Sequence, residues 1–526
     1  MIEVKRIIQA TTVVTLISLV VKGLGFLEKI LLAYFFGTGI EVDAYLVAYS
    51  IPFSAYIVLR EVVKPSFLPT FLRLRQRSEQ DGGRLFITVG MVLFIFLGLA
   101  TVGGVFLADS LVSLAAPGFD DEQRLLTVRL VRIVIPAMFL LGLSTLTTAA
   151  LHAEKRFVLP AMGEASFRAG PLVLLGLLGG VQAMACGVVL GTLGKLGLEM
   201  AGLRKSLRQV RPILDLASEP VRTVGRLAAP LLVALSLSLF VGPLVENAFA
   251  SQVGVGGVSA LAYARKIAET LTTILPYALG LVLLPFSAEM VVSKNLESLA
   301  MMVRGAVRAL VLLFLPLTIG LMVFRKPFVQ LLFERGAFDA ASTQLTIGPL
   351  LFYALALLPF ALEVVIVQFF FAHRDTLTPV ITDMVTFALN VALIPPLMAI
   401  YGLGGIALAA TIAKTVKVLA LLFLFHRRVP AFRLRPFAPF AGQMILASLA
   451  AAAVFLAAGL AQERFWGGIG QELSSNPVML AAYLAISGAL GSGIFYAVAY
   501  WLRVDEIRSL QRRAVAWGQA LIRSLR

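Results

Sequence analysis

The sequence predicts an all-helical membrane protein that crosses the bilayer many times. Of its 526 residues, 59% are hydrophobic and 14% are charged, whereas a soluble globular chain averages roughly 45–50% apolar and ~25% charged residues. Apolar runs long enough to cross ~30 Å of hydrocarbon as a helix recur along the whole chain. These observations exclude soluble enzymes, secreted modules and disordered tails. The continuous apolar runs also exclude a β-barrel, whose strands alternate apolar and polar residues.

Polar connectors divide the chain into about fourteen predicted spans, each near the ~20 residues that a transmembrane helix needs. The first span follows a short basic N-terminus, but it runs on to about Phe36 without a cleavage site, so we expect it to be retained. The predicted spans are residues 9–35, 42–68, 85–107, 126–150, 158–179, 181–203, 227–250, 256–285, 307–324, 346–371, 379–399, 403–425, 439–461 and 478–502.

Basic residues concentrate in the connectors on one side of the predicted membrane. Because cytoplasmic loops carry an excess of Lys and Arg, we expect both termini in the cytoplasm. The net charge of +16 then reflects membrane topology and not nucleic-acid binding. Residues 503–526 predict a basic amphipathic helix on the anionic leaflet. The basic connector residues include Arg73, Arg75, Arg77, Arg84, Lys155, Arg156, Arg204, Lys205, Arg208, Arg211, Arg222, Arg226, Arg427, Arg428, Arg433 and Arg435.

Ionisable residues inside the predicted spans gather in the first, second and eighth spans. Each costs ~2.5–3.5 kcal/mol at a helix centre, so such residues face an interior or a wet cavity. We interpret the group as a cavity in which cations bind an anion such as a phosphate. Structural neutralisation is the alternative, and near the interface so is snorkelling. The predicted cavity residues are Lys22, Glu28, Lys29, Asp43, Arg60, Glu61, Lys64, Arg265 and Lys266.

Other charges inside the spans are read mainly as structural. Glu164 with Arg168, and Lys195 with Glu199, have the i, i+4 spacing of ion pairs within one helix. Carboxylate oxygens elsewhere suit a coupling cation such as sodium, or a proton, and structural acids are the alternative. The candidate coupling-ion residues are Glu246, Asp383 and Asn390.

No constellation of an enzyme is found in the sequence. His152, His373 and His426 lack metal-ligand spacing, so we expect no metal and no other cofactor. No phosphate-binding loop of an ATPase occurs, so energy would come from sodium, protons or the membrane potential. The single cysteine, Cys186, is expected as a small core residue, and the glycines at 187, 191 and 194 predict close helix packing.

A faint internal echo relates the two halves of the chain. Gly37-Thr38-Gly39 leads to Ala48-Tyr49, and Gly254-Val255-Gly256 leads to Ala262-Tyr263. The two copies fall at spans one and two and at spans seven and eight, where a duplication of six-helix halves would place them. Such repeats are common in transporters.

Longer motifs follow one another in a fixed order between the first predicted span and the start of the eleventh. They are Gly23-Leu24-Gly25-Phe26, Val42-Asp43-Ala44-Tyr45, Phe67-Leu68-Pro69, Ala116-Pro117-Gly118-Phe119, Ala262-Tyr263-Ala264-Arg265-Lys266, Leu332-Phe333-Glu334-Arg335-Gly336-Ala337-Phe338 and Arg374-Asp375-Thr376-Leu377-Thr378-Pro379. In these motifs the chain resembles the MurJ/MviN lipid II flippases of the multidrug/oligosaccharidyl-lipid/polysaccharide exporter superfamily. The resemblance covers nearly the whole chain.

The resemblance implies two six-helix lobes in a V around a cationic cavity, residues 1–226 and 227–438. Residues 439–502 would form two further helices with a groove for a lipid tail, and 503–526 the cytoplasmic tail. It implies a transporter and not an enzyme. The implied activity is flipping of lipid II, an undecaprenyl-pyrophosphate-linked peptidoglycan precursor, across the bacterial cytoplasmic (inner) membrane by alternating access, for cell-wall synthesis. The implied partners are lipid II or a similar glycolipid, membrane lipids and the cell-wall synthesis machinery, with no nucleic acid.

Family cavity residues carry over unevenly. By resemblance, Lys22 and Lys266 stand where the family has Arg, and Asp43 matches the family's acid in the second span. The family's Arg-Asp pair after the Gly-Phe motif is Glu28-Lys29 here, and its second-span Arg pair falls at neutral residues 55 and 56. A flippase for another polyprenyl-linked glycan, such as an O-antigen, teichoic or exopolysaccharide intermediate, is therefore the main alternative. A drug antiporter, a membrane glycosyltransferase and a non-transporting scaffold are weaker ones.

Overall fold

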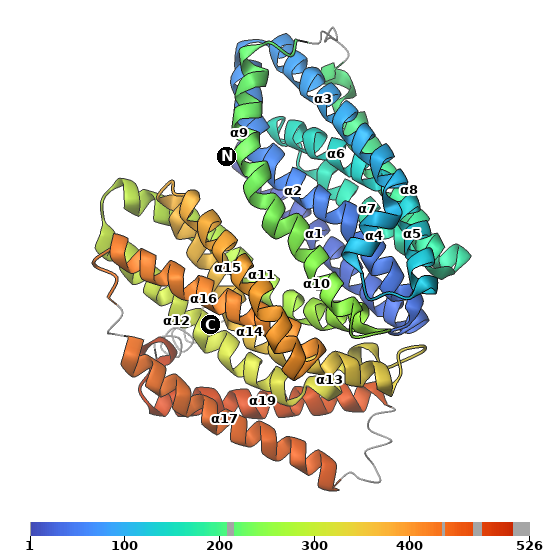
Figure 1. Ribbon diagram of the computed structural model, residues 1–526. Coiled ribbons are helices and arrows are strands. Elements are labelled where there is room, and N and C mark those ends of the chain that lie inside the picture. The colour runs from blue at the N-terminus through green and yellow to red at the C-terminus, as the bar shows by residue number, and fades with distance from the viewer. Residues whose placement is uncertain (1, 208–214, 434–436, 466–475, 509–526) are drawn as a thin grey trace. The chain divides into compact units, whose positions relative to one another are not determined.

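The computed structural model describes residues 2–207, 215–433, 437–465 and 476–508, and helices dominate these segments (Figure 1). Eleven helical segments are long and apolar enough to cross a membrane, and a bent helix at 340–372 makes a twelfth. Helices of 35 and 36 residues cover the first and eighth predicted spans. All of the predicted spans thus coincide with helices, and the all-helical polytopic fold class is confirmed.

Contacts divide the chain into two units, Met1–Ser259 and Ala260–Arg526. The lobe limits expected near residues 226 and 438 stay predictions. The first unit is built of α1 (Ile2–Phe36), α2 (Ile40–Arg77), α3 (Glu79–Phe106), α4 (Ala108–Ala115), α5 (Asp121–Val134), α6 (Pro136–Ala153), α7 (Val158–Leu178), α8 (Gly180–Leu207), α9 (Glu219–Leu235), the π-helix η1 (Ser236–Val241) and α10 (Gly242–Ser251). The second is built of α11 (Gly257–Val292), α12 (Leu296–Val323), α13 (Arg325–Phe333), α14 (Ala340–Ala372), α15 (Leu377–Tyr401), α16 (Leu403–Arg428), α17 (Phe437–Phe465) and α19 (Pro477–Trp501).

The two units repeat one supersecondary pattern. In each, the third span is followed by a short helix, α4 in the first unit and α13 in the second. A turn then leads to an aspartate that caps the fourth span. Asp120 accepts a hydrogen bond from the Gln123 backbone N–H at 2.8 Å, and Asp339 accepts one from the Ser342 backbone N–H at 2.8 Å. The shared cap chemistry supports the internal duplication that the sequence echo indicates.

The fourth span of each unit is interrupted. In the first unit it divides into α5 and α6, because Pro136 begins the second segment and cannot donate a backbone hydrogen bond to the turn before it. In the second unit α14 bends by 43° between Leu355 and Leu357, a few residues before Pro359. The predicted spans at 126–150 and 346–371 are therefore a broken helix and a bent helix.

Glycines bring α7 and α8 into backbone contact, as the sequence predicts. A Cβ at Gly187 would lie 2.5 Å from the Gly170 carbonyl oxygen, and one at Gly191 would lie 2.8 Å from that of Phe167. Larger residues at these positions would force the helices apart. This packing fixes the rotation of α7 and with it the direction of the charged residues on that helix.

The last two described spans pack onto α12. Phe455 of α17 contacts Phe324 edge-on, with ring centroids 5.5 Å apart, and a Cβ at Gly491 of α19 would clash with the Phe455 ring at 2.1 Å. Phe440 and Phe495 belong to the same buried cluster. The helices of residues 439–502 are thus part of the core of the second unit, and their use as a lipid-tail groove stays a prediction.

The expectation for Cys186 is wrong, and that for the C-terminal tail falls mostly outside the described residues. Cys186 is exposed on α8 and is not a core residue, because the buried face of α8 passes through Ala185 and Gly187 on either side of it. Most of the predicted amphipathic tail, residues 509–526, lies outside the described residues, as do the basic residues Arg208, Arg211 and Arg435.

Candidate functional site

The charged residues of the first span lie on the second half of α1. Lys22 is exposed, Lys29 is half-buried, and Glu28 is buried with 3% of its surface exposed. The two lysines lie seven residues apart and therefore share a helical face. Glu28 lies one position away and points into the first unit.

Glu28 meets an arginine from another helix. A guanidinium nitrogen of Arg168, on α7, lies 3.6 Å from Glu28 Oε2. The same group donates a 3.4 Å hydrogen bond to the Tyr49 hydroxyl on α2. Arg168 and Glu164, which the sequence predicts as a pair, each form their ion pair with a residue of another helix, Arg168 with Glu28 and Glu164 with Lys195.

Arg168 sits against aromatic rings. Its guanidinium carbon lies 5.1 Å from the ring centroid of Phe167 and 5.5 Å from that of Phe53, distances that allow cation–π attraction. Phe53 stacks in turn on Tyr49, with centroids 4.9 Å apart. The rings of Phe53 and Phe167 therefore contact the guanidinium group. Its polar contacts with Glu28 and Tyr49 are longer than charge-assisted hydrogen bonds, which measure ~2.7–2.9 Å. About 26% of the Arg168 side chain is exposed.

Asp43 serves a different role in the structure from the lining of a cavity. It is fully buried, and its two carboxylate oxygens accept hydrogen bonds from the backbone N–H groups of Gly256 and Ser259 at 2.7 and 2.8 Å. These N–H groups lie at the start of α11, where orphaned donors and the helix dipole favour a negative charge. Asp43 thus ties the beginning of α2 to residues 256–259, which belong to the same unit.

The remaining predicted residues of the second span lie on the surface of α2. Arg60 and Glu61 form an ion pair of 3.0 Å in which each side chain is about half exposed, 51% and 50%. Lys64 is also exposed. Arg60 Cζ lies 5.9 Å from the ring centroid of Tyr56. An exposed pair of this kind contributes ~0.2–1 kcal/mol at most, so its charges remain available to a ligand.

A closed charge network lies deeper in the first unit. Lys195, with 2% of its side chain exposed, binds Glu164 at 2.8 Å and Glu199 at 3.3 Å. The predicted Lys195–Glu199 pair is confirmed, but Glu164 is the nearer partner. Glu199 also accepts hydrogen bonds from the hydroxyls of Ser144 and Thr148, at 2.9 and 2.8 Å, and from that of Thr147. The network joins α6, α7 and α8, and its charged groups bind one another and neighbouring hydroxyls.

The predicted cations of the second unit lie on α11. Arg265 donates to the Tyr353 hydroxyl of α14 through two nitrogens, at 3.1 and 3.3 Å. Lys266 is half-buried beside it, and Glu269 one turn on is exposed. The structure therefore places Arg265 and Lys266 at adjacent positions, with Arg265 held from α14.

A second lysine network lies in the second unit. Lys417, with 3% of its side chain exposed, binds Glu363 at 2.6 Å and also contacts Asp383. Lys414 binds the other oxygen of Glu363 at 2.6 Å. Sequence reasoning missed both lysines, although charges in the middle of the apolar segment 403–425 were the available signal. Of the candidate coupling-ion residues, Asp383 is thus engaged by a lysine, Asn390 lies two turns along α15, and Glu246 lies on α10 of the first unit.

The two networks occupy corresponding places in the two repeats. Lys195 lies on α8 and Lys417 on α16, the sixth predicted span of each half. Each binds an acid of the preceding span, Glu164 on α7 or Asp383 on α15. An intrahelical rule predicts neither partner, because both lie on another helix. Among the described residues, no group of three or more His, Cys, Asp or Glu side chains is arranged to hold a metal.

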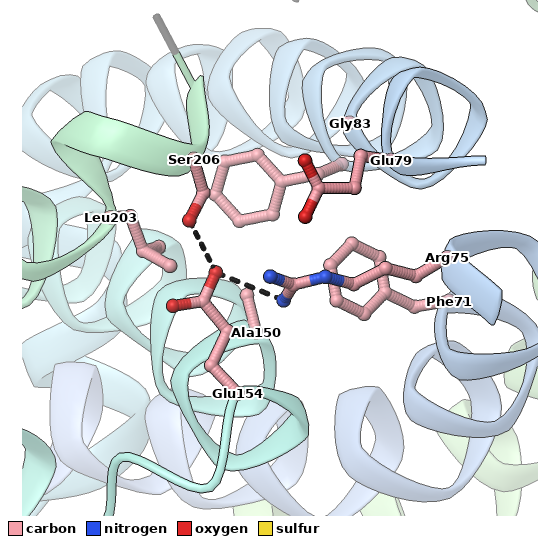
Figure 2. Close-up of a pocket in the computed structure, with 9 residues that line it drawn as sticks. Phe71, Arg75, Glu79, Gly83, Ala150, Glu154, Leu203 and Ser206 are labelled. Atoms are coloured by element: carbon pink, nitrogen blue, oxygen red, sulfur yellow. Dashed lines mark hydrogen bonds and ion pairs between the residues drawn. The ribbon is translucent and has the colours of Figure 1, made fainter. Parts of the chain in front are cut away.

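A small cleft marks one end of the first unit (Figure 2). Glu154, just after α6, pairs with Arg75 of α2 at 2.9 Å and accepts a hydrogen bond from the Ser206 hydroxyl of α8 at 2.6 Å. The cleft has a volume of about 20 Å³, which is room for about one water molecule. It joins the ends of four spans, and it is too small for a substrate.

Taken together, the fold and its charges define a class: an integral membrane transporter built of two related halves, with cations inside its spans. The model of the family described as lipid II flippase MurJ matches residues 32–471. The chain belongs to the MurJ lipid II flippase family.

Relatives of similar length support the membership. A probable lipid II flippase MurJ of Rhizobium meliloti is 27% identical over 518 residues, covering 94% of this chain and 93% of the relative. The lipid II flippase MurJ of Burkholderia cenocepacia is 26% identical, covering 90% of this chain and 94% of the relative.

Solved structures share the fold. A lipid II flippase MurJ in an inward closed conformation matches with a TM-score of 0.75 at 21% identity, over 93% of this chain and 98% of that one. An inward-facing multidrug resistance transporter of the MATE family, from the MOP superfamily, matches with a TM-score of 0.66 at 16% identity, over 78% of this chain and 94% of that one.

Proposed function

We propose that this protein flips lipid II from the inner to the outer leaflet of the bacterial cytoplasmic membrane and so supplies precursor for cell-wall synthesis. Membership of the MurJ family is the observation that carries the proposal. It also favours lipid II over the other polyprenyl-linked glycans, because the family match extends through residue 471 and the named relatives are aligned over nearly their full length.

The substrate has a pyrophosphate that cations must bind and later release. We assign this task in the first unit to Lys22, Lys29 and Arg168, and in the second to Arg265 and Lys266. Lysines offer point charges, whereas a guanidinium can donate two parallel hydrogen bonds to a phosphate. Arg168 supports this assignment because its polar contacts, at 3.4 and 3.6 Å, are long enough to be exchanged for a ligand.

The cycle needs no chemical step on the substrate. The head-group site opens to one face of the membrane and then to the other, while the apolar tail stays in the bilayer. We propose that sodium, protons or the membrane potential drives this cycle, and that Glu246, Asp383 and Asn390 are the residues to test for ion coupling. Both termini would face the cytoplasm, in line with the basic connectors.

Complementation tests the proposed function directly. The chain is expressed in a bacterium depleted of its own lipid II flippase, and growth and externally accessible lipid II are followed. We expect rescue by the parent chain and by the control Arg124→Gln, whose exposed pair with Asp109 lies outside the assigned residues. We expect no rescue by Lys22→Ala at matched membrane levels. A well-inserted parent chain that fails to rescue would indicate another substrate.

A further inference from the structure

An apolar groove runs along the outside of the first unit, apart from the charged residues. It is formed by α3, α6 and α8 and has a volume of about 490 Å³. Met91 and Phe94 of α3 and Met200 of α8 form its walls, and Leu146 of α6 forms its floor. The one hydroxyl in the lining, that of Thr147, donates to Glu199 inside the unit. The groove therefore offers carbon surface to an occupant.

Gly90 makes the groove deep. It lies on α3 between the wall residues, and a Cβ there would come 3.4 Å from a methyl group of Leu146. A larger side chain at this position would project into the groove and fill it. Phe94 and Met200 are 56% and 43% exposed, so the groove opens to the surface that the bilayer covers. A hydrocarbon chain of the membrane would match such an apolar, outward-facing groove.

Two arginines flank one end of the groove. Arg84 precedes Met91 by seven residues on α3, and Arg204 follows Met200 by four on α8, so each lies on the groove-lining face of its helix. Both side chains are exposed. The adjacent residues Gly83 and Leu203 line the same small cleft, which places the start of α3 beside the end of α8 (Figure 2).

Cations outnumber acids at this end, where Glu79 and Glu154 also line the small cleft and Glu154 is paired with Arg75. The acid near Arg84 is Asp81, at 3.8 Å, and both side chains of this pair are 48% exposed, so the contact is weak. Lys205 adds a further exposed cation. The groove has apolar walls and is flanked at one end by Arg84 and Arg204, so it matches a lipid with an apolar chain and an anionic head group.

We propose that this groove binds one acyl chain of an anionic phospholipid, whose phosphate is held by Arg84 and Arg204. The groove is a site for a lipid of the surrounding membrane, and the proposal does not depend on which substrate the protein transports. A phospholipid is favoured over the substrate because the groove contains none of the residues assigned to the head group.

Native mass spectrometry of the full-length protein tests the site. Phosphatidylglycerol and phosphatidylcholine of the same chain length are titrated into the delipidated protein. We expect one phosphatidylglycerol to be retained in preference to phosphatidylcholine. The double variant Arg84→Gln/Arg204→Gln should weaken this binding by roughly tenfold or more, because each cation near an anionic lipid contributes ~1 kcal/mol. The matched control Arg222→Gln/Arg226→Gln removes two exposed arginines of α9 and should leave it unchanged.

Filling the groove tests the chain-binding part. Gly90→Leu should reduce retention of both lipids, and Met200→Trp should do the same from the opposite wall if Gly90→Leu proves poorly folded. Equal retention of the two lipids, equal loss in the control and the Arg84/Arg204 variant, or normal binding by both groove-filling variants would overturn the proposal. Displacement of the bound lipid by undecaprenyl phosphate at equimolar concentration would also overturn it, in favour of the substrate tail.

Discussion

Arg168 on α7 and Glu28 on α1 face each other across 3.6 Å inside the first unit, although 140 positions separate them in the sequence. Phe53 and Phe167 hold the guanidinium by ring contacts, and its polar bonds are long. Lys195 of α8 differs from Arg168, because two acids at 2.8 and 3.3 Å already bind its ammonium. The first arrangement suits exchange with a ligand, and the second suits a fixed structural role.

Replacement of Arg168 should therefore affect transport more than stability. We expect Arg168→Ala to abolish rescue of a flippase-depleted strain, and Arg168→Lys to retain partial activity, because an ammonium keeps the charge without the bidentate geometry. Glu28→Gln should weaken the hold on the guanidinium while leaving Arg168 able to bind a phosphate. Growth, lipid II exposure and the melting temperature are measured together. Full rescue by Arg168→Ala would remove this residue from the site.

Lys417 should matter for stability. Its substitution by Met leaves Glu363, whose side chain is 15% exposed, and Asp383, whose side chain is 42% exposed, without the ammonium that binds both. Removing one partner of a buried pair such as Lys417–Glu363 costs ~3–5 kcal/mol. We expect a large fall in the melting temperature of the purified protein. Adding Asp383→Asn to Lys417→Met should recover part of the loss, since it removes one of the two neighbouring acidic charges that the lysine neutralises. If the two substitutions lower the melting temperature additively, Lys417 and Asp383 do not interact as the network requires.

Asp43 should be sensitive to the loss of charge alone. Asn at this position keeps the size of the side chain but replaces one acceptor oxygen by an NH₂ group, which cannot accept the hydrogen bond of Gly256 or Ser259. A hydrogen bond to a charged group contributes ~1.5–3 kcal/mol. We expect Asp43→Asn to lower the melting temperature and to speed hydrogen exchange at residues 256–260. Unchanged exchange there would show that the cap at α11 contributes little.

The connector between α14 and α15 should respond to acid. Burial opposes ionisation of Asp375, but hydrogen bonds from the side chain and backbone of Thr378, at 2.5 and 3.0 Å, and the charge of Arg428 outweigh it and lower the pKa of Asp375 below its ordinary value of 3.8. The ionised form therefore stabilises the fold above that ordinary pKa, and this contribution is lost as the pH falls through the lower folded pKa.

The melting temperature between pH 6 and pH 3 measures this effect. The parent protein should lose stability toward pH 3, and Asp375→Asn should start lower at pH 6 and show a shallower decline. Because other carboxylates titrate in the same range, the comparison between the two proteins is the informative quantity. Parallel curves for the two proteins would contradict a contribution from the charge of Asp375.

The sequence by itself determined the helical spans, because a hydrocarbon core of fixed thickness demands long apolar runs whatever the rest of the chain does. It also determined the close contact of α7 and α8, since the glycines there permit it directly. The partners of Glu28, Asp43, Glu164 and Asp383 were decided only by the tertiary structure. Helical spacing predicts contacts within one helix, whereas a buried charge binds whichever opposite charge or orphaned N–H the packing of neighbouring helices brings to it.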